Sequence, residues 1–245
     1  MFKQFKNLIR RIKFYLKKAD IKLSNDVSDN LEISTLRKNG VIFRKYSEVN
    51  ELGLKKIVNY CSKIINAEDF NKKCEKITNA KKNSKLNKKY KIDITDIFDE
   101  NILLSLEKKS LMPSIAKKYF KKVAYMNNFA ITKDIFVNNP PLHTQIFHRD
   151  GDSFFLLKFF IYLNKVNESN GPFQYLKSSH INNDEFSKKK IESKFHKNLL
   201  TYCGDVGDVI IADTNGYHKG KQILKETESR YLLTFMYSDK NFYQK

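Results

Sequence analysis

The chain has 245 residues, 41% of them hydrophobic and 19 of them phenylalanine, which fits one packed domain and excludes a disordered chain. Its formal net charge of +19 comes almost entirely from lysine, and asparagine and isoleucine are also abundant, so the charge reflects an A+T-rich coding bias more than a nucleic-acid surface. No RNP motif, zinc-finger spacing or glycine-rich phosphate loop accompanies it, and we expect no specific nucleic-acid partner.

The first 22 residues are predicted to form a basic amphipathic helix. Six apolar residues from Phe2 to Leu16 recur at helical intervals, and seven lysines and arginines surround them. Such a helix can lie on an anionic membrane surface through residues 1–20, peripherally on the inner membrane face. Alternatively, it docks its apolar stripe on the folded domain. Because the chain lacks a signal-peptide pattern, a run of about 20 apolar residues and any disulfide spacing, we expect a cytoplasmic protein.

Residues 23–121 are predicted to be mainly helical and to buttress the part that follows. Apolar residues recur at helical intervals from Leu54 to Ile65, and two further helices are expected over 93–106 and 111–120. Before them, a polar stretch over 24–32 indicates a linker, and 36–48 indicates a short extended segment.

From residue 122 onward the hydrophobic period changes from helical to strand-like. Strands are expected at 123–132, 145–148, 155–163, 173–176, 209–212 and 230–237, separated by glycine, proline, asparagine and aspartate. Helices followed by closely spaced strands predict a mostly β fold with a helical N-terminal part, in which a closed or sandwiched antiparallel sheet is buttressed by helices. We place this β core over residues 122–245.

A candidate metal site follows from His148-Arg149-Asp150 and His218. Residues i and i+2 of an extended strand point the same way, so His148 and Asp150 can reach one ion while Arg149 points elsewhere. His218, just after the strand-like segment 208–213, is the candidate third ligand. Two imidazoles and one carboxylate on one face of an ion are typical of open non-haem Fe(II) sites. The alternative is a strand-end histidine that merely bonds a nearby carboxylate.

Several segments around these residues carry a family resemblance: Gln145–Asp152, Leu157–Leu163, Asn170–Phe173, Ser178–His180 and Asp213–His218, followed by Arg230. Their order and spacing resemble the phytanoyl-CoA dioxygenase family over roughly residues 125–238. The resemblance implies a double-stranded β-helix, a jelly-roll and cupin-like fold. It also implies Fe(II) held by His148, Asp150 and His218, with 2-oxoglutarate and O2 as cosubstrates. Hydroxylation is the implied outcome, since halogenases of this kind lack the carboxylate that Asp150 supplies.

Arg230 is the candidate partner for the distal carboxylate of 2-oxoglutarate. A buried carboxylate needs a cation, and the planar fork of arginine binds it bidentately. The chain is rich in lysine and uses arginine at only 6 positions. Arginine at 230 therefore indicates a role that lysine cannot fill. Arg230 opens an apolar run 12 residues after His218, the interval expected of a paired strand, and the family places its carboxylate-binding arginine there. The alternative is a surface arginine that opens a strand.

Three further residues complete the predicted cofactor-binding set. Lys158 interrupts an apolar strand, and its ammonium needs an anion, which 2-oxoglutarate, a substrate or a carboxylate of the fold could supply; a snorkelling lysine is the alternative. Tyr162 shares the same face and could donate to the cosubstrate or bond to backbone in the core. Gln145 and the adjacent Thr144 precede the triad on the same strand, where polar groups are expected to line the pocket.

These features together predict an Fe(II)- and 2-oxoglutarate-dependent dioxygenase that hydroxylates a small-molecule substrate. If the N-terminal helix binds a membrane, a lipid-linked or surface-glycan precursor is the expected substrate. The alternative is a non-catalytic β-barrel binding module, or a basic peripheral membrane protein that kept the fold without iron. The metal content of the purified protein distinguishes these alternatives from the enzyme.

Overall fold

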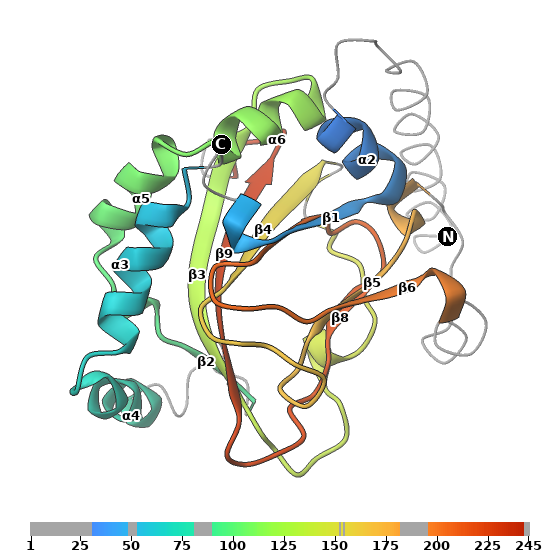
Figure 1. Cartoon of the computed structure of the whole chain (residues 1–245). Coiled ribbons are helices and arrows are strands. Elements are labelled where there is room, and N and C mark those ends of the chain that lie inside the picture. Colours follow the sequence, from blue (N-terminus) through green and yellow to red (C-terminus); the bar gives the residue numbers. More distant parts are fainter. Residues whose placement is uncertain are drawn as a thin grey trace, which may run out of the picture.

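The computed structural model describes residues 31–48, 53–80, 90–151, 153, 155–181 and 196–242 (Figure 1). The expected N-terminal helix at residues 1–22 lies outside these residues. In chain order, the helices and strands are α2 (Leu31–Asn39), β1 (Val41–Arg44), α3 (Lys55–Ile65), α4 (Phe70–Ala80), β2 (Lys91–Asp93), α5 (Glu100–Lys108), α6 (Met112–Phe120), β3 (Tyr125–Ile135), β4 (Leu156–Tyr162), β5 (Phe173–Leu176), β6 (Leu199–Tyr202), β7 (Val209–Asp213), β8 (His218–Gly220) and β9 (Ser229–Ser238). None of the described helices has the length and apolar content needed to cross a bilayer.

Two antiparallel sheets face each other and form the body of the fold (Figure 1). The large sheet has six strands in the order β1-β7-β4-β9-β3-β2, and the small sheet has three in the order β6-β5-β8. Neighbouring strands are often far apart in sequence, as β1 beside β7 and β4 beside β9 show. This is a double-stranded β-helix with helices on one side, as expected from the sequence.

Alternation along the strands gives the large sheet two buried faces. On β4, Phe159 and Ile161 belong to a hydrophobic cluster shared with the helices, whereas Phe160 and Tyr162 belong to a second cluster with Phe173 of β5. Successive side chains of a strand point to opposite faces, so one set packs under the helices and the other points toward the small sheet. Burial on both faces explains why β4 is almost continuously apolar.

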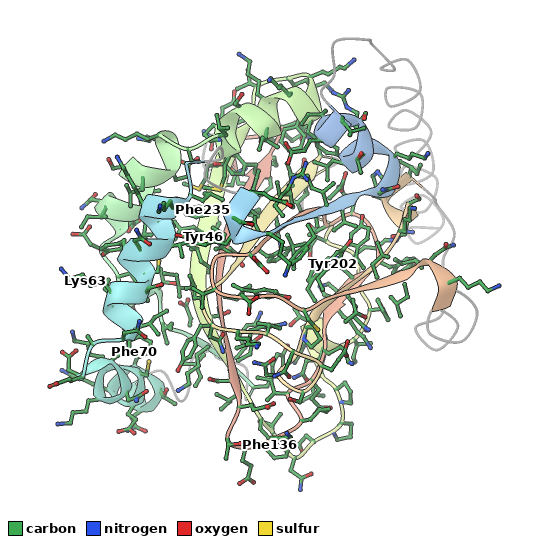
Figure 2. All side chains as sticks on the ribbon, viewed as in Figure 1. Tyr46, Lys63, Phe70, Phe136, Tyr202 and Phe235 are labelled. Carbon is green, nitrogen blue, oxygen red and sulfur yellow. The ribbon has the colours of Figure 1, made fainter. Side chains whose placement is uncertain are left out.

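Helices α3, α4, α5 and α6 cover the outer face of the large sheet (Figures 1 and 2). The ring of Phe70 on α4 packs against Tyr231 of β9, with centroids 5.7 Å apart. Asp99 caps the N-terminus of helix α5, and its side chain accepts hydrogen bonds from two backbone N–H groups of the first turn. The helices therefore close one face of the sheet and leave the other for the interior between the sheets.

Several short elements differ from those expected. Residues 31–39, expected to be partly linker and partly extended, form α2, because Ile33, Leu36 and Arg37 are buried on one helical face. Arg37 also donates to the carbonyl of Lys118 at 2.6 Å, which ties α2 to the end of α6. Strands β2, β6 and β8, each of 3 or 4 residues, were not expected at all.

Candidate metal centre

His148 and His218 lie directly opposite each other on neighbouring segments. The backbone N–H of each donates to the carbonyl of the other, at 3.1 and 3.0 Å, and the ring centroids are 4.3 Å apart. Directly opposite residues project their side chains on the same face. The expected strand at 145–148 is reduced to this single bridge, because residues 143–145 instead form a 3-10 helix.

Asp150 joins the two histidines. Its backbone N–H donates to the carbonyl of Thr214 at 2.9 Å. Its Oδ1 lies 3.9 Å from His148 Nε2, and its Oδ2 lies 3.8 Å from His218 Nε2. One ion with bonds of about 2.1 Å can span such gaps. The structure thus brings the three predicted ligands together, and within the described part of the chain no fourth histidine, cysteine or carboxylate completes the group.

The second ring nitrogen of each histidine faces a backbone carbonyl. His148 Nδ1 lies 2.9 Å from the carbonyl oxygen of Ile146, and His218 Nδ1 lies 2.9 Å from that of Gly216. Because a carbonyl oxygen only accepts, a neutral imidazole bonded in this way carries its proton on Nδ1 and leaves the lone pair of Nε2 for a metal. Hydrogen bonds of this kind fix the ring orientation of metal-binding histidines.

The protonation states of the group suit a divalent cation. Burial lowers the pKa of His218 to about 3, so this imidazole is neutral at pH 7. Burial by itself would raise the pKa of Asp150, but its interactions with His218 and Lys158 outweigh burial and hold the pKa below its usual range. Two imidazoles and one carboxylate, without thiolate, fit Fe(II) and similar first-row ions.

Lys158 faces the same centre from the inner face of β4. Its Nζ lies 2.8 Å from Asp150 Oδ2. Of the partners considered for this lysine, the structure provides a carboxylate of the fold, and that carboxylate is itself a candidate metal ligand.

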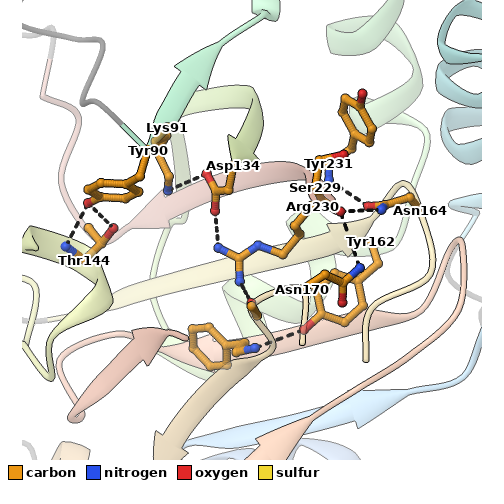
Figure 3. Close-up of polar contacts among 12 residues, drawn as sticks. Tyr90, Lys91, Asp134, Thr144, Tyr162, Asn164, Asn170, Ser229, Arg230 and Tyr231 are labelled. Atoms are coloured by element: carbon orange, nitrogen blue, oxygen red, sulfur yellow. Dashed lines mark hydrogen bonds and ion pairs between the residues drawn. The ribbon is translucent and has the colours of Figure 1, made fainter. Parts of the chain in front are cut away.

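Arg230 lies on the inner face of β9 and is almost completely buried. Its guanidinium pairs with Asp134, directly opposite on β3, and donates to the carbonyl of Gly171 (Figure 3). Asp134 also lies 3.9 Å from the ammonium of Lys91. The Nε of Arg230 and the Oγ1 of Thr132 are buried without a hydrogen-bond partner, so they are available to a polar ligand.

The strands of His218 and Arg230 are not paired, contrary to the expectation from their 12-residue interval. Strand β8 belongs to the small sheet and β9 to the large one, so the intervening residues cross between sheets. The strands instead face each other, since a Cβ on Gly220 would lie 2.7 Å from an Nη atom of Arg230. Gly220 follows His218 by two residues, so the guanidinium lies about 7 Å along β8 from the histidine.

One cavity joins these groups. It has a volume of about 280 Å³ and is lined by the three candidate ligands together with Lys158 and Arg230. Most of its other walls come from the inner faces of β3, β4 and β9 and from Phe173 of β5, and Lys91, Thr144 and Gly220 complete them. The candidate metal centre therefore opens into a space large enough for small organic molecules.

Gln145, predicted to bind the cofactor, does not line this cavity. Its buried side chain accepts a hydrogen bond from the backbone N–H of Leu142 at 3.1 Å and so holds the 3-10 helix. The adjacent Thr144 lines the cavity instead, and its hydroxyl lies 2.9 Å from that of Tyr90 (Figure 3).

Tyr162 also lies away from the cavity wall. It is fully buried, and its hydroxyl donates to the carbonyl of Tyr202 at 2.7 Å and accepts from the backbone N–H of Phe173 at 3.2 Å. These bonds join β4 to β6 and to β5. Tyr162 therefore has the core role that was the alternative to cofactor binding.

Sequence reasoning missed the contribution of β3. Asn128, Thr132 and Asp134 alternate with the more apolar Phe129 and Ile131, and the polar set faces the interior. This alternation was a readable signal for a cavity-facing wall.

Gly220→Ala should disturb Arg230. The added Cβ would meet the two Nη atoms at 2.7 and 3.0 Å, and Asp134 and Gly171 already hold the guanidinium in place. We expect the free energy of unfolding to fall by about 1–3 kcal/mol in urea denaturation. Gly151→Ala is the control, because an added Cβ there has no neighbour within 4 Å. Equal stability of the two variants would contradict the close approach.

No protein-family model and no curated protein matches this chain. Solved structures share its fold. EctD from S. alaskensis with 2-oxoglutarate and 5-hydroxyectoine is 13% identical, with a TM-score of 0.60 over 88% of this chain and 78% of its own. The carbocyclase SnoK from nogalamycin biosynthesis, described as non-heme and alpha-ketoglutarate dependent, is 15% identical, with a TM-score of 0.56 over 86% and 85%. HygX from Streptomyces hygroscopicus with nickel and 2-oxoglutarate is 14% identical, with a TM-score of 0.56 over 88% of both chains. The structural similarity supports the double-stranded β-helix fold and, at these identities, shows the fold alone.

Proposed function

We propose that this chain is an Fe(II)- and 2-oxoglutarate-dependent dioxygenase, similar to the phytanoyl-CoA dioxygenase family. One observation carries the proposal: a single cavity holds an open group of two histidines and one carboxylate, and a buried arginine of β9 meets β8 about 7 Å beyond His218. The solved structures support it, because EctD and HygX were determined with 2-oxoglutarate and SnoK is described as depending on it.

The spacing fits a five-carbon dicarboxylate. Four carbon–carbon bonds of about 1.5 Å give an extended length of about 5 Å, so a molecule anchored at the triad reaches the guanidinium of Arg230. The guanidinium donates to Asp134. The Nε of Arg230 and the Oγ1 of Thr132 have no hydrogen-bond partner and can bind the distal carboxylate.

The residues of the chain then have distinct roles. His148, Asp150 and His218 would hold Fe(II) on one face, and the bound metal would supply the oxidative decarboxylation of 2-oxoglutarate to succinate with O2 and the oxidation of a substrate C–H bond. Arg230 orients the cosubstrate. Phe160 and Phe173 form an apolar wall that limits water beside the centre. Because Asp150 keeps a carboxylate at the metal, we propose hydroxylation of a small molecule.

An anaerobic titration tests the proposal. Protein purified without oxygen and loaded with Fe(II) should develop a weak visible charge-transfer band when 2-oxoglutarate is added, and admitting air should yield succinate. Protein that binds neither Fe(II) nor 2-oxoglutarate would contradict the enzyme and favour a non-catalytic binding module.

We further propose a cytoplasmic protein whose first 20 residues contact an anionic membrane. Seven cations at about 1 kcal/mol each, together with an apolar stripe, favour binding. Deleting residues 1–20 should abolish sedimentation with anionic liposomes while leaving uncoupled 2-oxoglutarate decarboxylation unchanged.

A double substitution sharpens that test. Leu8→Ser with Ile12→Ser interrupts the stripe but keeps every charge, so it should weaken liposome binding and separate burial from electrostatic attraction. If full-length protein ignores the liposomes and the truncated protein precipitates, the segment docks on the domain, and the proposal of a lipid-linked or surface-glycan precursor as substrate loses its support.

A further inference from the structure

Lys158 and Arg230 lie at opposite ends of the cavity-facing sheet. Met236 of β9 pairs with Lys158 on one side and with Asn128 on the other. Asp134, in contrast, pairs with Arg230, six residues from Met236 and about 20 Å away along the strand. The two side chains therefore start from opposite ends of the sheet, and the Lys158 ammonium reaches the triad at Asp150, about 7 Å along β8 from the guanidinium.

The carboxylate of Asp150 balances the positive charge of Lys158. The side chain of Lys158 is 19% exposed and lines the cavity, with Nζ 2.8 Å from Asp150 Oδ2. Among the described residues that line the cavity, Asp150 is the sole carboxylate. A divalent ion at the triad would take up that negative charge. The ammonium would then face a cation at short range, which is unfavourable without a new anion.

With a divalent metal and 2-oxoglutarate bound, the charges at the cavity other than that of Lys158 cancel. A divalent metal is matched by Asp150 and by the keto-acid carboxylate of 2-oxoglutarate. Arg230 and Lys91 are matched by Asp134, which contacts both, and by the distal carboxylate. Of the described charged groups at the cavity, Lys158 is left with a positive charge that neither metal nor cosubstrate balances.

We propose that Lys158 is a substrate-anchoring residue that binds an anionic group, a carboxylate, phosphate or sulfate, carried by the substrate close to the carbon that is oxidised. This inference rests on the proposed function and names its substrate class. Because Nζ lies within hydrogen-bond distance of a metal ligand, an anion held there lies beside the metal. Asn128, on the far side of Met236, also lines the cavity with a polar side chain.

Calorimetric titrations of the full-length protein test the inference in three steps. Ni(II) is added first as a metal that does not turn over, then 2-oxoglutarate, and then inorganic sulfate as the anion probe in chloride-free buffer. We expect sulfate to bind at least about tenfold more tightly to the loaded protein than to the metal-free protein, since the metal releases Lys158 from Asp150. Dimethyl sulfone, a neutral molecule of similar shape, should not bind.

Substitutions assign the effect to the side chain. Lys158→Met and Lys158→Gln should each weaken sulfate binding by about tenfold or more, and Lys158→Arg should stay within about threefold of the wild type. Lys133→Met is the matched control, because Lys133 lies on the outer face of β3 with Nζ 5.5 Å from the ring of Tyr231. Its sulfate affinity should equal that of the wild type.

The contrary outcomes are distinct. Unchanged sulfate affinity in both neutral variants would mean that sulfate binds the metal directly, and would overturn the inference. Competition between sulfate and 2-oxoglutarate, with parallel losses of both in Lys158→Met, would assign Lys158 to the cosubstrate instead. If the neutral variants do not fold, equal binding of sulfate and dimethyl sulfone by the wild type overturns the inference. Failure of Ni(II) or 2-oxoglutarate to bind removes the proposed function itself, before sulfate is added.

Discussion

His148→Ala, Asp150→Ala and His218→Ala are each expected to abolish metal binding at the triad and turnover of 2-oxoglutarate. Hydrogen bonds outside the ligand shell are already worth about 10–100-fold in metal affinity, and removing one of three protein ligands costs more. Titration with Ni(II), and the Fe(II)-dependent visible band, measure the loss. The fold should persist by circular dichroism, because the hydrophobic clusters that stabilise it lie on other residues.

The three variants should differ in stability. Asp150→Ala leaves the ammonium of Lys158 without the carboxylate now 2.8 Å away, so it should be less stable than either histidine variant by about 1–3 kcal/mol. His143→Asn is the control, since His143 does not line the cavity and asparagine tolerates its left-handed φ of 49°. Tight metal retention in all three alanine variants would move the centre elsewhere.

The long strands were predictable because their burial leaves a clear trace in the sequence. Strands β4 and β7 are buried on both faces, so they read as apolar runs between polar turns, and both were expected within a few residues of their observed bounds. The order of helices before strands also led to the correct fold class. Local pattern was enough where an element was long and deeply buried.

The short elements were not predicted, because their local sequence carries too little of this pattern. Strands β2 and β8 have 3 residues each, too few to show an alternation, and the pairing of each with a distant partner defines them. Helix α2 contains the β-branched residues Ile33 and Thr35, and it is held by the contact from Arg37 to α6. Such tertiary contacts are absent from any local window of sequence.

The site shows the same division between local and distant information. The i, i+2 spacing of His148 and Asp150 placed two of the three grouped residues by elementary geometry. Arg230 stood out because the chain otherwise prefers lysine. Its partner Asp134, however, lies opposite it only once β3 pairs with β9, and that register cannot be read from either strand alone.

Arg230→Leu should raise the Michaelis constant for 2-oxoglutarate about a hundredfold or more. The variant would leave a carboxylate buried and unpaired, at a cost of about 3–5 kcal/mol. Arg230→Lys should recover part of the loss, because it restores the charge without the planar fork. Steady-state kinetics with varied 2-oxoglutarate measure the effect. Affinity for Ni(II) should stay within about threefold of the wild type, since Arg230 is not a ligand.

Asp134 also loses its main partner in the Arg230→Leu variant. Arg230→Leu also leaves Asp134 with only Lys91, 3.9 Å away, so part of the damage is an orphaned carboxylate of the protein itself. Adding Asp134→Asn should therefore regain stability in the double variant but not its affinity for 2-oxoglutarate. If the double variant recovers both, repulsion from Asp134 caused the defect. If Arg230→Leu alone uses 2-oxoglutarate normally, the cosubstrate binds elsewhere in the cavity.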